Sequence, residues 1–185
     1  MEHYIEIRLL PDPEFSDSII LNALFAKLHR ALSDVGGGQI GVSFPKTKKT
    51  LGEILRIHGS RTALEKLMNQ RWLKGLNDYT RVSEILPIPN TCKYRCVKRI
   101  QSKSNVERLY RRSVKKGWIA PTEAESKIAE AENKTLKQPF LCLKSKSSSQ
   151  EFKLFIMHCE VKDKPQCDGN FSNYGLSNKK TIPWF

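Results

Sequence analysis

The sequence has 185 residues and a formal net charge of +13, because 32 Lys and Arg residues outnumber 19 Asp and Glu residues. A hydrophobic fraction of 39% is enough for a folded core and excludes a wholly disordered chain. No stretch approaches the ~18 consecutive apolar residues of a membrane span, and the first residues lack the basic and apolar regions of a secretory signal. We therefore expect a cytoplasmic protein with no membrane attachment.

The first half of the chain predicts the element order β-α-β-β-α-β. Residues 4–9 alternate between apolar and polar side chains, which indicates a half-buried strand. A helix is expected from about residue 17 to 32, because its apolar residues fall within a ~140° arc of a helical wheel. Strands at 40–44 and 55–58, a second helix at 60–68 and a strand at 82–88 follow. This order is that of a ferredoxin-like domain, which we expect to occupy residues 1–90.

The second half, residues 91–185, predicts a second and less regular α+β domain. A strand is expected at 94–101, followed by a basic helix from about 106 to 116 that Gly117 ends. Pro121 opens a mostly acidic helix. The remaining strands are expected at 140–143, 152–157 and 171–176. The predicted fold class is therefore α+β, with an N-terminal ferredoxin-like domain and a second domain that carries an arginine-rich helix.

Positive charge is concentrated in one window of this second half. Residues 93–116 hold ten basic residues and one acidic residue, Glu107, and thus a net charge of +9. On a helical wheel the cations of the basic helix gather on one side, where we expect a nucleic-acid interface. The candidate contacts on and just before this helix are Lys103, Arg108, Arg111, Arg112, Lys115 and Lys116. Charge alone does not decide between DNA and RNA, so a DNA-binding regulator remains an alternative.

Sequence motifs for most nuclease and nucleotide chemistry are missing. The chain has no P-loop and no G-x-S-x-G motif, and its acidic residues are scattered or lie on the acidic helix. Its five cysteines form no C-x-x-C pair and its four histidines are far apart, so we expect reduced thiols, no metal site and no cofactor. Metal-free RNA cleavage remains, because RNA carries its own nucleophile, the 2′-hydroxyl, and needs a base such as histidine.

His29 is the candidate base. On the helical wheel of the first helix it lies at the polar margin of the apolar arc, beside Phe25. A side chain at this margin is accessible and yet held by packing. The same pattern also fits an ordinary surface histidine. Phe152 likewise fits either an aromatic that stacks on an RNA base or a core residue of an alternating strand.

Several segments, taken in chain order, resemble one known family. They are residues 3–15, 24–29, 40–45, 99–105, 152–156, 174–177 and 183–185. Together they are similar to the CRISPR-associated endoribonuclease of type I-F systems, and the similarity extends over essentially the whole chain. The resemblance implies a metal-independent endoribonuclease of antiviral defence that recognises the CRISPR repeat stem-loop and cleaves at its 3′ base. It further implies that the 2′-hydroxyl is the nucleophile and that the product carries a 2′,3′-cyclic phosphate.

The resemblance also implies partners. They are the CRISPR repeat hairpin in the precursor RNA (pre-crRNA), the mature guide RNA (crRNA), to which the enzyme stays bound, and other subunits of a type I-F surveillance complex. The alternative that we keep is a non-catalytic RNA-hairpin-binding subunit with the same basic helix and an inert His29.

The resemblance assigns roles to individual residues. His29 matches the catalytic base, Ser145 the serine that holds the ribose, and Tyr174 the tyrosine that orients the histidine. Ser147 and Ser148 are neighbouring alternatives to Ser145.

Further residues match positions that recognise the hairpin. Arg99 and Gln101 match residues that read bases at the foot of the stem, and Phe152 matches the aromatic that stacks there. Arg108, Arg111 and Arg112 match the arginine-rich helix that enters the major groove of the hairpin. Lys115 and Lys116 depart from the arginines of the family, and a lysine cannot form the paired hydrogen bonds of a guanidinium. We therefore expect these two lysines to attract phosphates rather than to read bases.

Overall fold

The computed structural model describes all residues except 36, 102–105, 133–135 and 146–147. Its contacts divide the chain into two compact units. The main unit is Met1–Arg99 with Pro139–Phe185, and the helical unit is Ile100–Gln138. These units differ from the predicted division at residue 90, since the segment after residue 139 returns to the main unit and contacts its first helix.

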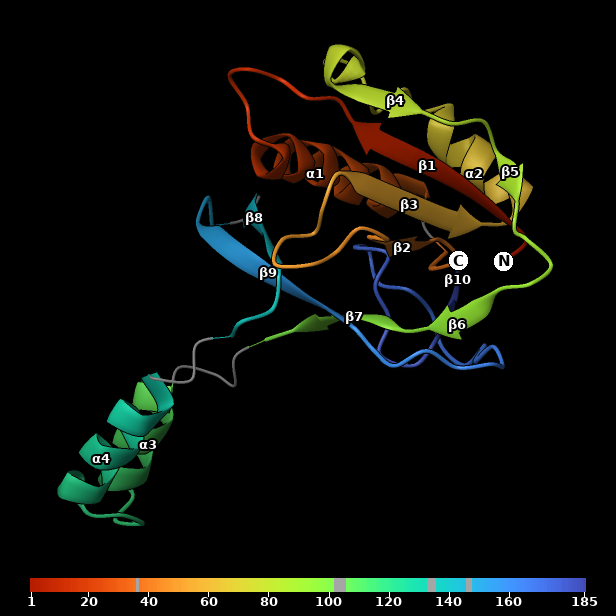
Figure 1. The fold of residues 1–185 in the computed structure, drawn as a ribbon. Helices are drawn as coiled ribbons and strands as arrows, with labels where there is room; N and C mark the ends of the chain where they lie inside the picture. The colour runs from red at the N-terminus through yellow and green to blue at the C-terminus, as the bar shows by residue number, and fades with distance from the viewer. Residues whose placement is uncertain (36, 102–105, 133–135, 146–147) are drawn as a thin grey trace. The chain divides into compact units, whose positions relative to one another are not determined.

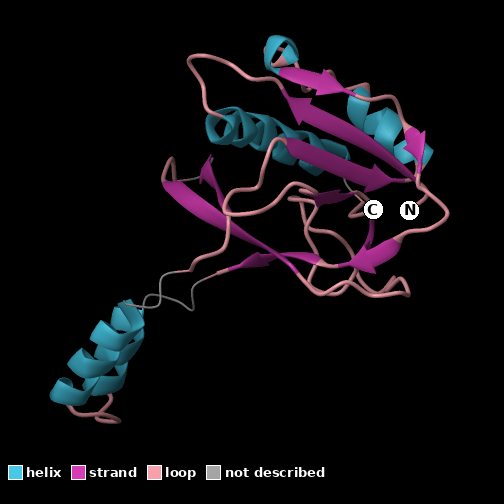
Figure 2. Ribbon diagram, in the orientation of Figure 1, coloured by secondary structure: helices cyan, strands magenta, loops and turns pink. Residues whose placement is uncertain are grey.

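The first part of the main unit is a five-stranded antiparallel sheet with two helices (Figures 1 and 2). Its elements are β1 (His3–Leu9), α1 (Asp17–Val35), β2 (Gly41–Ser43), β3 (Ile54–Gly59), α2 (Arg61–Met68), β4 (Thr80–Val82) and β5 (Leu86–Pro87). The strand order is β2-β3-β1-β4, and β5 also pairs with β1. The predicted β-α-β-β-α-β order is thus observed, although the strand expected at 82–88 is two short strands separated by residues 83–85.

Apolar periodicity explains how these elements pack. Ile5, Ile7 and Leu9 alternate along β1 and are buried on one face of the sheet. The buried residues of α1 are those of the predicted stripe: Ile20, Leu21, Leu24, Phe25, Leu28, Ala31 and Leu32. Both helices contact the sheet and each other, and this packing fixes which side of α1 remains accessible.

Two smaller sheets complete the main unit. One pairs β6 (Lys93–Arg95) with β10 (Ile182–Trp184), and the other has the order β7 (Val97–Ile100), β9 (Glu151–His158) and β8 (Phe140–Lys144). The predicted strand at 94–101 is interrupted at Cys96, because the chain changes partners there from β10 to β9 and the buried thiol donates to the Lys179 carbonyl. The strand predicted at 171–176 is wrong: this segment is a turn, and the last strand is β10.

The helical unit consists of α3 (Val106–Lys115) and α4 (Pro121–Glu132), which pack against each other. Both helices lie where the sequence predicts them. Gly117 ends α3 in the left-handed conformation, at φ +70°. The Gly117 N–H donates to the Val114 carbonyl and the Trp118 N–H to the Ser113 carbonyl, which is the hydrogen-bond pattern of a Schellman C-cap. Among the helices described in either unit, none combines the length and apolar character needed to cross a membrane.

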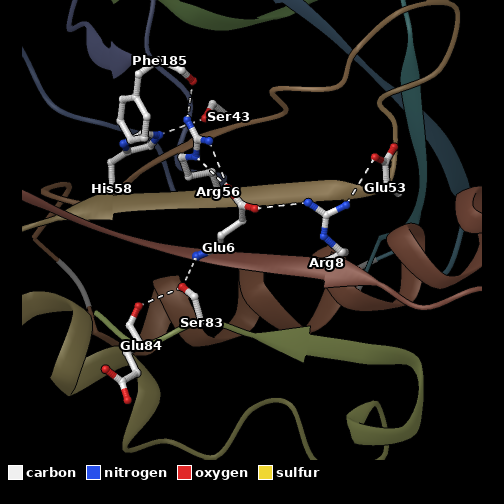
Figure 3. Close-up of polar contacts among 9 residues, drawn as sticks. All are labelled: Glu6, Arg8, Ser43, Glu53, Arg56, His58, Ser83, Glu84 and Phe185. Atoms are coloured by element: carbon white, nitrogen blue, oxygen red, sulfur yellow. Dashed lines mark hydrogen bonds and ion pairs between the residues drawn. The ribbon is translucent and has the colours of Figure 1, made fainter. Parts of the chain in front are cut away.

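A polar cluster lies on the opposite sheet face to Ile5 and Ile7, where Figure 3 shows Arg56 at its centre. Arg56 is 8% exposed; it pairs with Glu6 at 3.0 Å and donates to the Phe185 carbonyl at 2.8 Å. Its guanidinium carbon lies 4.1 Å from the centre of the Phe185 ring. These contacts hold Phe185 against β3.

Candidate functional site

A pocket of about 420 Å³ in the main unit gathers side chains that are far apart in the sequence. It is lined by Ala26, His29, Arg30, Leu143, Lys144, Ser145, Phe152 and Tyr174. All three residues predicted to be catalytic, together with Phe152, therefore meet in one pocket. A larger pocket of about 530 Å³ is lined by residues between 68 and 77 and contains none of the predicted site residues, so we place the candidate site in the smaller one.

The structure holds the His29 ring in one orientation. His29 lies on α1 at the edge of the buried stripe, half-buried, and its Nδ1 is 2.9 Å from the Asn173 carbonyl oxygen. A carbonyl only accepts hydrogen bonds, so Nδ1 is the donor, and in the neutral ring Nε2 keeps its lone pair. Tyr174 stacks on the imidazole, with ring centroids 4.1 Å apart and an interplanar angle of 10°. Tyr174 is itself parallel to the buried Phe25 ring at 6.4 Å, which connects the histidine to the core.

A tight turn at residues 172–175 positions Asn173 and Tyr174. Two hydrogen bonds close the turn. The Gly175 N–H donates to the Ser172 carbonyl at 2.8 Å, and the Ser172 N–H donates to the Leu176 carbonyl at 2.8 Å. The Gly175 carbonyl accepts from the Val42 N–H at 2.9 Å, which fastens the turn to β2. Gly175 adopts φ +68°, a backbone conformation that residues other than glycine rarely take.

Gly175→Ala is expected to destabilise the protein by about 2 kcal/mol or more and to weaken the His29–Tyr174 contact. A Cβ atom at Gly175 would lie 2.7 Å from the Val42 Cγ1, in addition to the backbone strain. Gly169→Ala is the matched control, because Gly169 has φ +84° and nothing within 4 Å of its Cβ position, so we expect it to cost only about 1 kcal/mol. Urea unfolding of both variants measures the difference; equal losses would contradict the role given to this turn.

Ser145 follows β8 and begins the loop to β9. Its N–H donates to the Gln150 carbonyl at 2.9 Å, and its hydroxyl accepts from the Ser148 N–H at 3.3 Å. Ser145 lines the pocket, whereas Ser148 does not. Ser147, the other alternative from the sequence, lies outside the described residues.

Arg99, on β7, lies against two aromatic side chains of the pocket, Phe152 and Tyr174. Phe152 is half-buried, packs against the core and also lines the pocket, so part of its ring is core and part faces the pocket. The exposed Arg99 guanidinium carbon lies 5.8 Å from the centre of the Phe152 ring and 5.9 Å from that of Tyr174. Both distances are within the range of a cation–π contact.

The other predicted RNA-binding residues belong to the helical unit. Gln101, Arg111, Arg112, Lys115 and Lys116 are exposed. The Lys116 Nζ lies 4.5 Å from the ring centre of Trp118, which is 70% exposed. Lys103 and the side chain of Arg108 lie outside the described residues.

Three polar groups at the pocket are missing from the sequence-based prediction: the Asn173 carbonyl and the side chains of Arg30 and Lys144. A backbone carbonyl leaves no signal in the residue pattern. Arg30 directly follows His29 and Lys144 directly precedes Ser145. Their position next to predicted site residues could therefore have identified both side chains as candidates.

Two other histidines are structural. His58 is buried, with its Nε2 2.9 Å from the Ser43 hydroxyl, and burial, reinforced by Arg56 and the N-terminus, lowers its pKa to about 3. Burial, with a smaller effect of Arg95, lowers the pKa of His158 to about 4. Within the described ranges, no three His, Cys, Asp or Glu side chains gather where they could hold a metal ion.

Comparisons with known proteins agree on one family. Residues 4–185 match the family described as CRISPR-associated protein (Cas_Csy4). The chain is 51% identical over 185 residues to the CRISPR-associated endonuclease Cas6/Csy4 of Escherichia coli (strain UTI89 / UPEC), and the match covers 100% of both chains. It is 43% identical over 188 residues to the protein of the same name from Pseudomonas aeruginosa (strain UCBPP-PA14), again over 100% of both chains.

A solved structure, of the CRISPR RNA processing endoribonuclease Cas6b, covers 99% of this chain and 100% of its own at 11% identity. Its TM-score of 0.33 is too low to support a conclusion about this protein. The sequence matches, by contrast, span the whole chain at high identity and include both the pocket residues and the basic helix. This chain is therefore a member of the CRISPR-associated Cas_Csy4 family.

Proposed function

We propose that the protein is an endoribonuclease that processes CRISPR RNA by cutting at the 3′ base of the repeat stem-loop. Its full-length relatives at 51% and 43% identity are named CRISPR-associated endonucleases. The observation that carries the proposal is the pocket in which His29, Ser145, Tyr174 and Phe152 come together. An inert RNA-binding module has no need for an accessible imidazole fixed in one tautomer.

In the proposed reaction the neutral His29 ring is the base. Its Nδ1–H is engaged by the Asn173 carbonyl, so Nε2 is available to take the proton of the 2′-hydroxyl. The bond from O2′ to phosphorus forms, the bond from phosphorus to O5′ breaks, and the leaving oxygen takes a proton from solvent. The products are a 2′,3′-cyclic phosphate and a 5′-hydroxyl. Tyr174 keeps the ring in place by stacking, and the Ser145 hydroxyl lies in the pocket to hold the ribose.

This reaction is proposed to need no metal. The attacking hydroxyl belongs to the RNA, so no metal-bound water has to be activated. Among the described residues, the pocket lining includes two cations, Arg30 and Lys144, and no carboxylate. Such a lining repels a divalent cation rather than binding it.

Recognition of the hairpin is proposed to use both units. At the pocket, Arg99 and Phe152 meet the foot of the stem, with Phe152 offering a ring face for stacking. On the helical unit, α3 would lie in the major groove near the hairpin end, with its arginines on base edges and phosphates. The remaining contacts that we propose are Gln101, Lys103, Arg108, Arg111, Arg112, Lys115 and Lys116.

Further proposals follow from family membership. The enzyme is proposed to stay bound to the mature crRNA and to join other subunits of a type I-F surveillance complex. We also propose a ferredoxin-like domain over residues 1–90, since its sheet has the strand order β2-β3-β1-β4 with both helices packed on it, and an RNA-binding role for residues 91–185.

Replacing the single 2′-hydroxyl at the cleavage site by hydrogen tests the reaction type. With excess protein in EDTA, we expect the unmodified repeat hairpin to be cut and the substituted hairpin to be bound but not cut, because the nucleophile is gone. Cleavage of both RNAs would contradict the mechanism. Binding of both without cleavage would favour the non-catalytic RNA-hairpin-binding subunit, and stronger binding to duplex DNA would favour a DNA-binding regulator.

A further inference from the structure

Two cations that the proposed reaction does not yet use line the candidate site. Arg30 comes from α1, directly after His29, and Lys144 comes from the end of β8, directly before Ser145. Both side chains are exposed, and neither forms an ion pair with an acidic residue in the described part of the chain. Two separate elements thus direct uncompensated positive charge to the same pocket.

The Arg30 guanidinium is partly fixed. Its Nε donates to the Ala26 carbonyl at 3.2 Å, one helical turn earlier on the same face of α1. This hydrogen bond uses Nε alone. The two terminal nitrogens of Arg30 have no hydrogen-bond partner among the described residues. Ala26, His29 and Arg30 are spaced by three and four positions, so they share one helix face and line the pocket together.

The chemistry of RNA cleavage creates a need for such charges. When O2′ attacks, a phosphodiester with one negative charge passes through a five-coordinate phosphorus that carries additional negative charge on its non-bridging oxygens. His29 acts on the 2′-hydroxyl as a neutral base, so it is not the group that supplies positive charge to the phosphate oxygens. Positive groups held where charge develops stabilise a transition state more than the ground state, and they therefore raise the rate more than the affinity.

We propose that Arg30 and Lys144 stabilise the negative charge that develops on the scissile phosphate, as two further catalytic residues of the pocket. This inference rests on the proposed function. It adds no proton transfer: His29 takes the 2′-hydroxyl proton, the O2′–P bond forms, the P–O5′ bond breaks, and the 5′-oxygen is protonated by solvent. The two cations face the non-bridging oxygens, so their attraction grows as negative charge develops there in the transition state.

The test is single-turnover cleavage of the repeat hairpin in EDTA at saturating protein, together with the hairpin dissociation constant. Arg30→Gln and Lys144→Gln are each expected to cut roughly 10- to 100-fold more slowly, with the dissociation constant changed less than about threefold. Arg30→Lys is expected to regain part of the rate, since it restores the charge without the planar guanidinium.

Lys27→Gln is the matched control, because it removes one charge from the same helix while the Lys27 Nζ donates to the Lys74 carbonyl and lines no part of the pocket. Rates for Arg30→Gln and Lys144→Gln equal to that of Lys27→Gln would overturn the inference. So would losses that appear only in affinity and vanish at saturating protein. If the wild-type protein does not cut at all, the proposed function fails and the inference fails with it, a result distinct from either of these.

Discussion

His29→Ala is expected to lower the single-turnover rate of hairpin cleavage by roughly 10²- to 10⁴-fold, the usual contribution of a general base. Binding should change little, because the imidazole is half-buried against Tyr174 and offers the RNA one nitrogen, Nε2. The measurement is a time course in EDTA with excess protein, beside a filter-binding titration of the same RNA. The predicted pattern is lost cleavage with retained affinity.

His3→Gln is the control for losing an imidazole elsewhere, since His3 lies on β1 and lines no part of the pocket. We expect it to cut at the wild-type rate. Cleavage by His29→Ala at the rate of this control would show that another group is the base. A parallel loss of binding in His29→Ala would instead indicate that the residue serves recognition.

Lowering the pH from 7 to 5 is expected to reduce the free energy of unfolding by roughly 4 kcal/mol through two buried histidines. Burial lowers the pKa of His58 from 6.5 to about 3 and that of His158 from 6.5 to about 4. Both rings are therefore neutral in the folded protein at pH 5, whereas in the unfolded chain they are largely protonated below pH 6.5. The unfolded state binds more protons, so the stability that the neutral rings contribute is present well above pH 6.5. It is lost as the pH falls through 6.5 toward the folded-state pKa values, about 4 for His158 and about 3 for His58.

Urea unfolding at several pH values measures this effect. His58→Gln and His158→Gln should each flatten the dependence, by up to about 1.4 kcal/mol per pH unit in this window, and the double variant should flatten it further. The readout is the slope of the unfolding free energy against pH, so a substitution that also lowers stability at neutral pH does not affect the comparison. An unchanged slope in the double variant would contradict the assignment of buried neutral rings.

Local patterns predicted much of the fold. The apolar spacing of α1 predicts each of its buried residues, and Gly117 predicts the end of α3, because both effects act within one or two helical turns. The interruption at Cys96 and the turn at 172–175 are not predictable in this way. Each depends on which distant strand the backbone meets, and an apolar segment such as 171–176 fits a strand until its partner is known.

The same distinction between local and long-range contacts applies to the candidate site. Helical position makes His29 a candidate, but its stacking on Tyr174 joins residues 145 positions apart, and this contact is set by the anchoring of the turn to β2. Phe152 shows why residue type alone left two interpretations open, since its ring both packs on the core and faces the pocket. The Asn173 carbonyl, which fixes the tautomer, has no signal in the sequence at all.

In the proposed reaction, the His29 imidazole acts directly on the 2′-oxygen of the scissile ribose. The most direct test is a crystal structure of the protein with its cleaved hairpin, measuring the distance from His29 Nε2 to O2′ of the terminal cyclic phosphate. We expect these two atoms to be in hydrogen-bond contact, about 2.6–3.2 Å apart, with Ser145 beside the same ribose. A cyclic phosphate bound outside this pocket, with His29 facing only solvent, would contradict the proposed reaction.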